Sequence, residues 1–222
     1  MSRESRTFAN IGDQGILVYL PDEFAAFRFA TAMRDAAFDW LIDVVPAYSS
    51  VGVFFDTTRI RRADVCKHLE SVDSSRVTTA TTNKLHVIPC CYALQLDLQR
   101  IAEHTHLEPD EVIRLHADRE YTVYAIGFAP GFPYLGYLPP ELCGVPRLAS
   151  PRLRVEPGSV GLTGKQTGIY PEARPGGWNL IGRTPLTLVD VEDGYFPLRV
   201  GDKVRFQRID EAEFGRLQGE RL

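Results

Sequence analysis

The chain has 222 residues, enough for one large or two small domains, and its composition of 44% hydrophobic and 24% charged residues is typical of a globular protein. A net charge of only −4 with scattered lysines and arginines argues against a nucleic-acid-binding surface. No apolar run approaches the about 18–20 residues of a membrane span, and residues 1–15 lack the apolar region of a signal peptide, so we expect a cytoplasmic protein. The four cysteines form no CxxC pair, which favours reduced thiols over a zinc site or disulfides.

Residues 1–82 predict a small α+β domain. An apolar run at 16–20 predicts a strand, and Asp22 can cap a helix whose apolar residues recur three or four apart through residue 37. Strands ending at residues 45 and 55 and a helix after residue 60 complete the order ββαββα, which predicts an open sheet with helices on one face. Residues 74–83 are small and polar and predict the linker to a second domain.

Residues 83–222 predict a mainly-β domain. A strand at 85–91 contains Pro89, which favours an edge or a bulge, and helices are expected at 96–104 and from Pro109. From Tyr121 onward, β-rich runs at 121–128, 186–191 and 204–209 are separated by proline and glycine turns, with almost no helical periodicity. That pattern is typical of a small barrel or sandwich.

Residues 127–136 read GFAPGFPYLG and set three aromatic side chains among residues that stiffen or bend the backbone. This pattern predicts a loop that holds Phe128, Phe132 and Tyr134 around a small pocket. The alternative is a packed barrel loop whose aromatic rings are only plugs.

A second stretch, residues 158–171, contains a Gly-Lys pair that invites comparison with a phosphate loop. The comparison fails because Gln166 stands where Ser or Thr must follow Lys165, and Ser159 replaces the upstream glycine. Gly168 and Pro171 also oppose the helix that such a loop needs. We therefore expect this chain to bind no ATP or other cofactor.

A third stretch, residues 174–185, places Trp178 after a glycine pair and ends with Arg183. An indole can form one wall of a pocket, and a guanidinium can hold a carboxylate through two parallel hydrogen bonds. The alternative for Arg183 is a structural salt bridge inside the barrel.

The histidines His104, His106 and His116 lack the spacing of a zinc motif, so no metal site is expected and surface positions are favoured. His116 remains a candidate acid–base or substrate-contact residue because it lies next to the β region. No Ser-His-Asp or Cys-His signature is present, so the catalytic residues are unknown.

Taken in order, GFAPGFPYLGYLP from Gly127, SPRLRVEPGSVGLTGKQTGIYP from Ser150, RPGGWNLIGRTP from Arg174 and GDKVRF from Gly201 resemble one family across nearly the whole chain. It is the allophanate hydrolase subunit 1 family, also called the 5-oxoprolinase B-type or kinase A inhibitor-like family. The resemblance implies an α+β N-terminal domain followed by a cyclophilin-like β-barrel. The sequence departs from the family at residues 91–98, which lack a glycine-containing insertion, and at Arg147, which stands alone where paired arginines are usual.

The resemblance also implies partners and activity. Relatives act with a larger, C-like barrel subunit, together with a third, A-like one, in ATP-dependent cleavage of 5-oxoproline to glutamate, with ATP used by the complex. The first hypothesis is therefore a hydrolase subunit, inactive alone, that forms part of the substrate pocket. The alternatives are an inhibitor of a histidine kinase and a carboxyltransferase component of a urea carboxylase type of system. The expected substrate-binding residues are Gln166, Tyr170, Trp178 and Arg183, with Phe128, Phe132 and Tyr134 as pocket wall and His116 as a further candidate.

Overall fold

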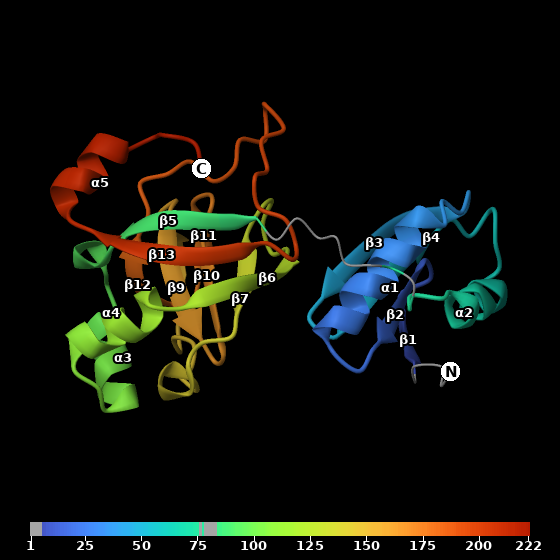
Figure 1. Ribbon diagram of the computed structural model, residues 1–222, viewed down its shortest axis with the longest axis horizontal. Coiled ribbons are helices and arrows are strands. Elements are labelled where there is room, and N and C mark those ends of the chain that lie inside the picture. Colours follow the sequence, from blue (N-terminus) through green and yellow to red (C-terminus); the bar gives the residue numbers. More distant parts are fainter. Residues whose placement is uncertain (1–5, 76, 78–83) are drawn as a thin grey trace. The chain divides into compact units, whose positions relative to one another are not determined.

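The computed structural model describes residues 6–75, 77 and 84–222 of the chain. It divides into two compact units, Met1–Thr81 and Thr82–Leu222, which are described separately below. In Figure 1 the first unit runs from blue to teal and the second from green to red. The predicted boundary between residues 82 and 83, with most of the predicted linker, lies outside the described residues.

The first unit is an antiparallel sheet of order β1-β2-β4-β3 with two helices packed against it. Phe29 and Met33 of the first helix and Leu69 of the second share one apolar core with Val18 and Val53 of the sheet. The predicted order ββαββα is thus confirmed, and its first strand lies before residue 16, where no strand had been placed. The elements are β1 (Thr7–Ile11), β2 (Gly15–Tyr19), α1 (Glu23–Asp35), β3 (Leu41–Ala47), β4 (Ser50–Phe55) and α2 (Arg62–Ser71).

Local sequence explains where these elements begin and pair. The Asp22 side chain accepts a hydrogen bond of 2.7 Å from the N–H of Ala25, as predicted for an N-cap. Pro46 lies within β3, which is an edge strand, where a residue without an N–H is tolerated.

The second unit is a closed seven-stranded barrel of order β10-β7-β6-β13-β5-β12-β9, confirming the predicted fold class. A separate two-stranded ribbon pairs β8 with β11. The strands are β5 (Leu85–Cys91), β6 (Glu120–Ile126), β7 (Pro133–Gly136), β8 (Arg152–Val155), β9 (Ser159–Thr163), β10 (Gln166–Ile169), β11 (Arg174–Gly176), β12 (Asn179–Arg183) and β13 (Lys203–Ile209). The helices are α3 (Leu98–Thr105), α4 (Pro109–Ala117) and α5 (Glu211–Leu217), with single 3₁₀ turns at Tyr92–Leu94 and Pro140–Leu142.

The barrel closes between the first and last strands of this unit, β5 and β13, which lie side by side in Figure 1. They pair in parallel from Lys203↔Leu85 to Ile209↔Cys91. On its other side β5 meets β12 at Cys91↔Arg183, and most of that side has no ladder partner among the residues that the structure describes. Pro89 therefore lies in a strand that is half an edge, although the barrel is closed.

Inward-facing side chains of the strands and the apolar sides of α3 and α4 form one core. Ile101 of α3 and Val112 of α4 join Leu135, Leu162 and Phe206 in it. Both predicted helices are confirmed, and Pro109 occupies the first turn of α4 as expected.

Two predictions for the second unit are wrong. Residues 186–191 form no strand: Thr187 and Asp190 make only isolated bridges, and the apolar run is explained by Leu188 and Val189, which are buried in the barrel core. Helix α5 was not predicted because none of its seven residues is buried, so its sequence carries little helical periodicity. The four cysteines are free thiols. Within the described ranges no helix is long and apolar enough to cross a membrane.

Candidate functional site

Five aromatic residues that the sequence predicted as site residues gather on the outer side of the barrel wall. We call them the aromatic cluster. Phe132 is at its centre, with ring centroids 5.0 Å from Tyr134, 5.2 Å from Tyr170, 5.5 Å from Trp178 and 5.4 Å from Phe128. All four pairs are edge-to-face, which is a favoured arrangement for aromatic rings. Phe128 is 62% exposed and Tyr134 is partly exposed, so the cluster reaches solvent on one side.

Strand alternation and two backbone features explain why these rings meet. On β10 Thr167 points into the barrel, so its neighbour Gly168 faces out. A Cβ at Gly168 would lie 3.0 Å from the Phe132 ring and 3.1 Å from the Trp178 ring, so only glycine lets both rings lie on the strand. The loop before β7 is held by hydrogen bonds from Gly127 N–H to Phe132 O and from Phe132 N–H to Ala129 O.

The hydroxyl groups of the cluster lie in a positively charged setting. Burial raises the pKa of the Tyr170 hydroxyl, while hydrogen bonding by the Trp178 backbone and the charges of Arg147 and Arg152 act in the opposite direction. Burial likewise raises the pKa of Tyr134, and Arg147 opposes the shift. Both phenols are therefore neutral donors at neutral pH, with two guanidinium groups nearby.

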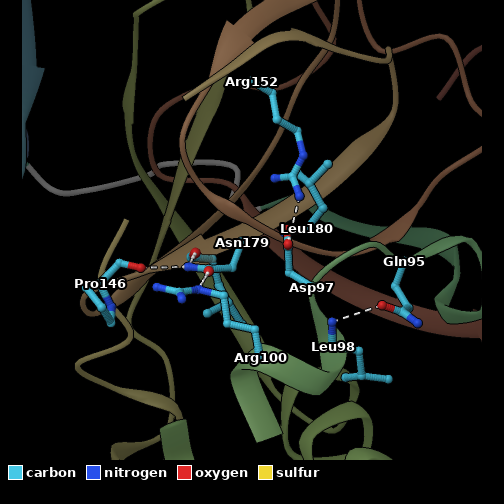
Figure 2. Close-up of polar contacts among 9 residues, drawn as sticks. Gln95, Asp97, Leu98, Arg100, Pro146, Arg152, Asn179 and Leu180 are labelled. Atoms are coloured by element: carbon cyan, nitrogen blue, oxygen red, sulfur yellow. Dashed lines mark hydrogen bonds and ion pairs between the residues drawn. The ribbon is translucent and has the colours of Figure 1, made fainter. Parts of the chain in front are cut away.

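Figure 2 shows a polar cluster of Asp97, Arg100, Arg152 and Asn179. It adjoins the aromatic cluster because Asn179 follows Trp178 in the chain and the charge of Arg152 acts on the Tyr170 hydroxyl. Asp97 is 7% exposed; one carboxylate oxygen pairs with Arg152 at 2.7 Å and the other accepts the N–H of Leu180 at 2.7 Å. Arg100 donates to Asn179 at 2.9 Å, and Asn179 donates to Pro146 O at 2.9 Å. These contacts hold the segment that carries Arg147 against the barrel.

A bulge in the ribbon aims Arg152 inward. Val155 pairs with Arg174 and Arg152 with Gly176, so two β8 residues oppose a single residue of β11. The irregularity places Arg152 and Val155 on the buried side and leaves Leu153 93% exposed. Among the described residues, the Nη1 nitrogen of Arg152 is buried and has no hydrogen-bond partner.

The structure brings together some predicted site residues and separates others. Phe128, Phe132, Tyr134, Tyr170 and Trp178 form the aromatic cluster, and Gln166 lies partly exposed on the same outward side of β10 as Gly168.

Arg183 lies apart from the cluster: its Nε donates to Pro157 O at 2.9 Å and its guanidinium faces Phe214 of α5. It forms no salt bridge with any residue that the structure describes, so the alternative of a structural salt bridge inside the barrel is wrong.

The expectation of a surface position is wrong for His116. Its ring is fully buried, bonded to the Tyr92 hydroxyl at 2.8 Å and to Thr167 at 3.0 Å, and stacked on Phe206. Burial lowers the pKa of His116 to about 3, so the ring is neutral in the core. In this position His116 cannot touch a ligand at the aromatic cluster. His104 and His106 are exposed as predicted.

Sequence reasoning missed the polar cluster. Arg152 lies just before the stretch that contains the Gly-Lys pair, which drew attention away from it. The signal that could have marked Arg152 was its position directly after Pro151 at the start of a strand. Asp97 falls within the helix predicted at 96–104; it stands at the N-cap position of α3 but makes no cap bond. Within the described ranges, no group of three or more His, Cys, Asp or Glu side chains is arranged to hold a metal ion.

The two-unit architecture and the motif order agree with the comparisons. The family model for the carboxyltransferase domain, subdomain C and D, matches residues 6–196, which defines the class of the chain. The B-type 5-oxoprolinase subunit of Bacillus subtilis (strain 168) is 35% identical over 229 residues, covering 92% of this chain and 93% of that protein. The chain belongs to the carboxyltransferase subdomain C and D family, in the branch that contains the B-type subunit of 5-oxoprolinase.

Two solved structures have the same fold. TTHA0988 superimposes with a TM-score of 0.77 at 34% identity, covering 89% of this chain and 40% of that chain. The present chain thus spans less than half the length of that relative. The urea amidolyase of Kluyveromyces lactis gives a TM-score of 0.79 at 18% identity, covering 97% of this chain and 15% of that one, a likeness of fold alone.

Proposed function

We propose that this chain is the B-type subunit of a 5-oxoprolinase-like hydrolase and that its aromatic cluster forms one wall of the site for a small cyclic amide. The observation that carries the proposal is the meeting of Tyr134, Tyr170 and Trp178 beside Arg147 and Arg152. A flat lactam can lie against the aromatic rings, while its carboxylate is held by guanidinium donors. The 35% identity over nearly the full length of a B-type 5-oxoprolinase subunit supports the substrate class.

The chain's own residues would bind and orient the substrate rather than activate it. Tyr170, Trp178 and Gln166 are the proposed contacts, and Arg152 replaces Arg183 as the proposed carboxylate donor. Tyr170 and Trp178 are only 2% and 5% exposed, and the Nη1 of Arg152 is shielded from solvent, so a substrate can reach these groups only when the β8–β11 ribbon shifts. Binding would then give that buried donor the acceptor it lacks.

The activation of the amide is assigned to other chains. A resonance-stabilised lactam needs its carbonyl oxygen phosphorylated or strongly polarised before water attacks, which requires a nucleotide site. After Lys165 the chain enters strand β10 at Gln166, so the helix N-terminus that holds phosphates in a phosphate loop is replaced by a hairpin. We propose that ATP binds to the A-like partner and that the pocket is completed by the larger C-like barrel protein.

Both departures from the family pattern lie beside the proposed pocket. Asp97 falls within residues 91–98, and Arg147 is the single arginine where two are usual. They contact or approach the groups that would hold the carboxylate, so 5-oxoproline and other small cyclic amides should be tested side by side.

The test is to co-express the chain with its neighbouring large and third subunits and to measure glutamate formed from 5-oxoproline with ATP. We expect the three chains together to be active and this chain alone to release no phosphate or glutamate. Tyr170→Phe should lower turnover of the complex at least about tenfold if its hydroxyl donates to the substrate. The matched control is Tyr19→Phe, an exposed hydroxyl of the first unit. Equal turnover by the two variants, or substrate-dependent phosphate release by this chain alone, would contradict the proposal.

A carboxyltransferase component is the second candidate, because the matching family model carries that description. Carboxyl transfer requires a biotin carrier, and hydrolysis of a lactam does not. Transfer of labelled carboxylate from biotin to an amide by the assembled complex, abolished by avidin, would favour this candidate. Avidin-insensitive glutamate formation favours the hydrolase.

A further inference from the structure

Arg183, at the end of β12, presents a guanidinium whose outer edge is unused. Its Nε donates to Pro157 O at 2.9 Å, and its guanidinium carbon lies 5.9 Å from the ring centroid of Phe214. Neither terminal nitrogen has a hydrogen-bond or ion-pair partner among the residues that the structure describes. The two N–H groups that form the planar fork are therefore free to bind an acceptor.

The fork lies in a hollow of about 320 Å³ between the end of β12, the C-terminal segment and α5. Its wall is mixed: polar atoms contribute more of the lining surface than apolar atoms, and Pro157, Pro171, Pro185 and Phe214 supply apolar surface. Binding pockets for small molecules have volumes of about 300–1,000 Å³, mostly apolar walls and a few placed polar groups. The volume of the hollow lies at the small end of that range, and its wall is more polar than that of an average pocket.

The backbone fixes the fork before any ligand arrives. Gly158 has a φ of +80°, and a Cβ there would collide with the carbonyl of Thr184, so the turn packs directly on the strand that carries Arg183. Thr184 N–H donates to Gly158 O at 2.9 Å, which closes the contact. Because Pro157 O then orients Nε, little side-chain entropy remains to be lost on binding.

Glu156, the acid on which the charge of Arg183 acts, does not line the hollow. Glu156 accepts from Arg154 at 2.7 Å, and this contact, with a smaller effect from Arg183, lowers its pKa. The Glu156 carboxylate is therefore already paired with Arg154 of β8. No member of the aromatic cluster lines the hollow, so the two places are distinct.

We propose that this hollow is a second binding site, for a compact carboxylate. Its two oxygens would accept from the terminal nitrogens of Arg183, and its carbon body would lie against the prolines and Phe214. A free small acid and the side chain of an acidic residue on an assembling protein present the same group. The small volume fits either one as a single carboxylate with a few carbons. This site goes beyond the proposed hydrolase function and does not depend on it.

The test is calorimetric titration of the full chain with acetate, 5-oxo-L-proline, L-glutamate and N-acetyl-glutamate α-amide, the last as a mimic of a protein side chain. Acetamide and 5-oxo-L-prolinamide are the uncharged controls. We expect the acids to bind and the amides not to bind, with Arg183→Lys at least about tenfold weaker because lysine lacks the two-point grip, and Arg183→Gln weaker still. Phe214→Leu should weaken binding while leaving the fork in place. The matched control is Arg208→Gln, an exposed arginine elsewhere on the barrel whose ion pair is long at 3.5 Å.

Each outcome of the titrations either supports or overturns the carboxylate site. Tighter binding of the free acids identifies a small-molecule site, and tighter binding of the α-amide identifies a protein carboxylate; both support a carboxylate site. Equal affinity of Arg183→Gln and the unmodified chain for every acid, no binding of any acid, or amides that bind as well as acids would overturn the proposal. These binding measurements need no catalytic complex. A negative titration therefore does not contradict the hydrolase proposal, and an inactive hydrolase complex does not contradict the carboxylate site.

Discussion

The ion pair between Asp97 and Arg152 gives a sharp test of how the β8–β11 ribbon is held on the barrel. The Asp97 side chain is 8% exposed and serves two donors, Arg152 and the N–H of Leu180, each at 2.7 Å. Asp97→Ala leaves both donors without an acceptor. Asp97→Asn keeps an acceptor oxygen but removes the charge.

The expected magnitude follows from the burial of each donor. A buried backbone N–H that loses its acceptor costs about 1–3 kcal/mol. Breaking a fully buried ion pair from one side costs about 3–5 kcal/mol. Arg152 is 26% exposed and can turn partly toward water, so the two effects together should lower the free energy of unfolding by about 3 kcal/mol for Asp97→Ala. For Asp97→Asn we expect about 1–2 kcal/mol, since Leu180 N–H keeps a partner.

Urea unfolding followed by tryptophan fluorescence measures the free energy of unfolding of each unit separately. Trp40 lies in the first unit and Trp178 in the second, so a Trp40→Phe background reports the barrel. The control is Glu111→Ala: its pair with Arg114 is as short, at 2.6 Å, but exposed, and it should give no measurable change.

A double variant then separates the ion pair from the rest of the effect. Asp97→Ala combined with Arg152→Met should be more stable than Asp97→Ala alone, because no charge is left stranded. An Asp97→Ala effect no larger than that of Glu111→Ala would refute the reasoning.

Two further predictions concern the barrel. Burial lowers the pKa of His116 from 6.5 to about 3. Between about pH 3 and pH 6.5 the unfolded chain therefore binds a proton at this residue and the folded chain does not. The free energy of unfolding should therefore fall as the pH drops below about 6.5, by up to about 1.4 kcal/mol per pH unit, and His116→Gln should flatten this dependence in urea titrations. Gly168→Ala would place a Cβ 2.8 Å from Pro133 O and 3.0 Å from the Phe132 ring, and should lower stability by about 1–3 kcal/mol and weaken the near-ultraviolet circular dichroism. Gly215→Ala, whose Cβ would meet open space, is its control, and an equal loss in both would argue against a packing effect.

Local patterns predicted most of the fold because each depends on neighbouring residues. The cap at Asp22, the proline that begins α4 and the proline and glycine turns between the barrel strands are all visible within a few positions. The meeting of Phe128, Phe132 and Tyr134 was also foreseen, since glycine and proline density marks a loop that can hold rings, and a pocket beside them stays a prediction. Helix α5 was not predicted because none of its residues is buried.

The polar half of the site could not be foreseen. Asp97 and Arg152 lie 55 positions apart, and no short-range pattern joins them. Trp178 and Arg183 were expected together because they share one stretch. Residues five apart in a strand lie about 16 Å from each other, and the irregularity in β12 between Leu180 and Gly182 also breaks the simple alternation of faces.

The parallel pairing of β5 with β13 has a consequence during synthesis. β5 emerges from the ribosome before the rest of the barrel, yet its main ladder partner is the last strand to be made. At about 5–20 residues per second, the intervening chain takes on the order of ten seconds to appear. Through that interval Val87 and Ile88 belong to a strand with open backbone edges, which can pair with a neighbouring nascent chain. Translation speed and chaperone access over residues 92–202 should therefore govern the yield of this protein more strongly than the stability of its finished barrel.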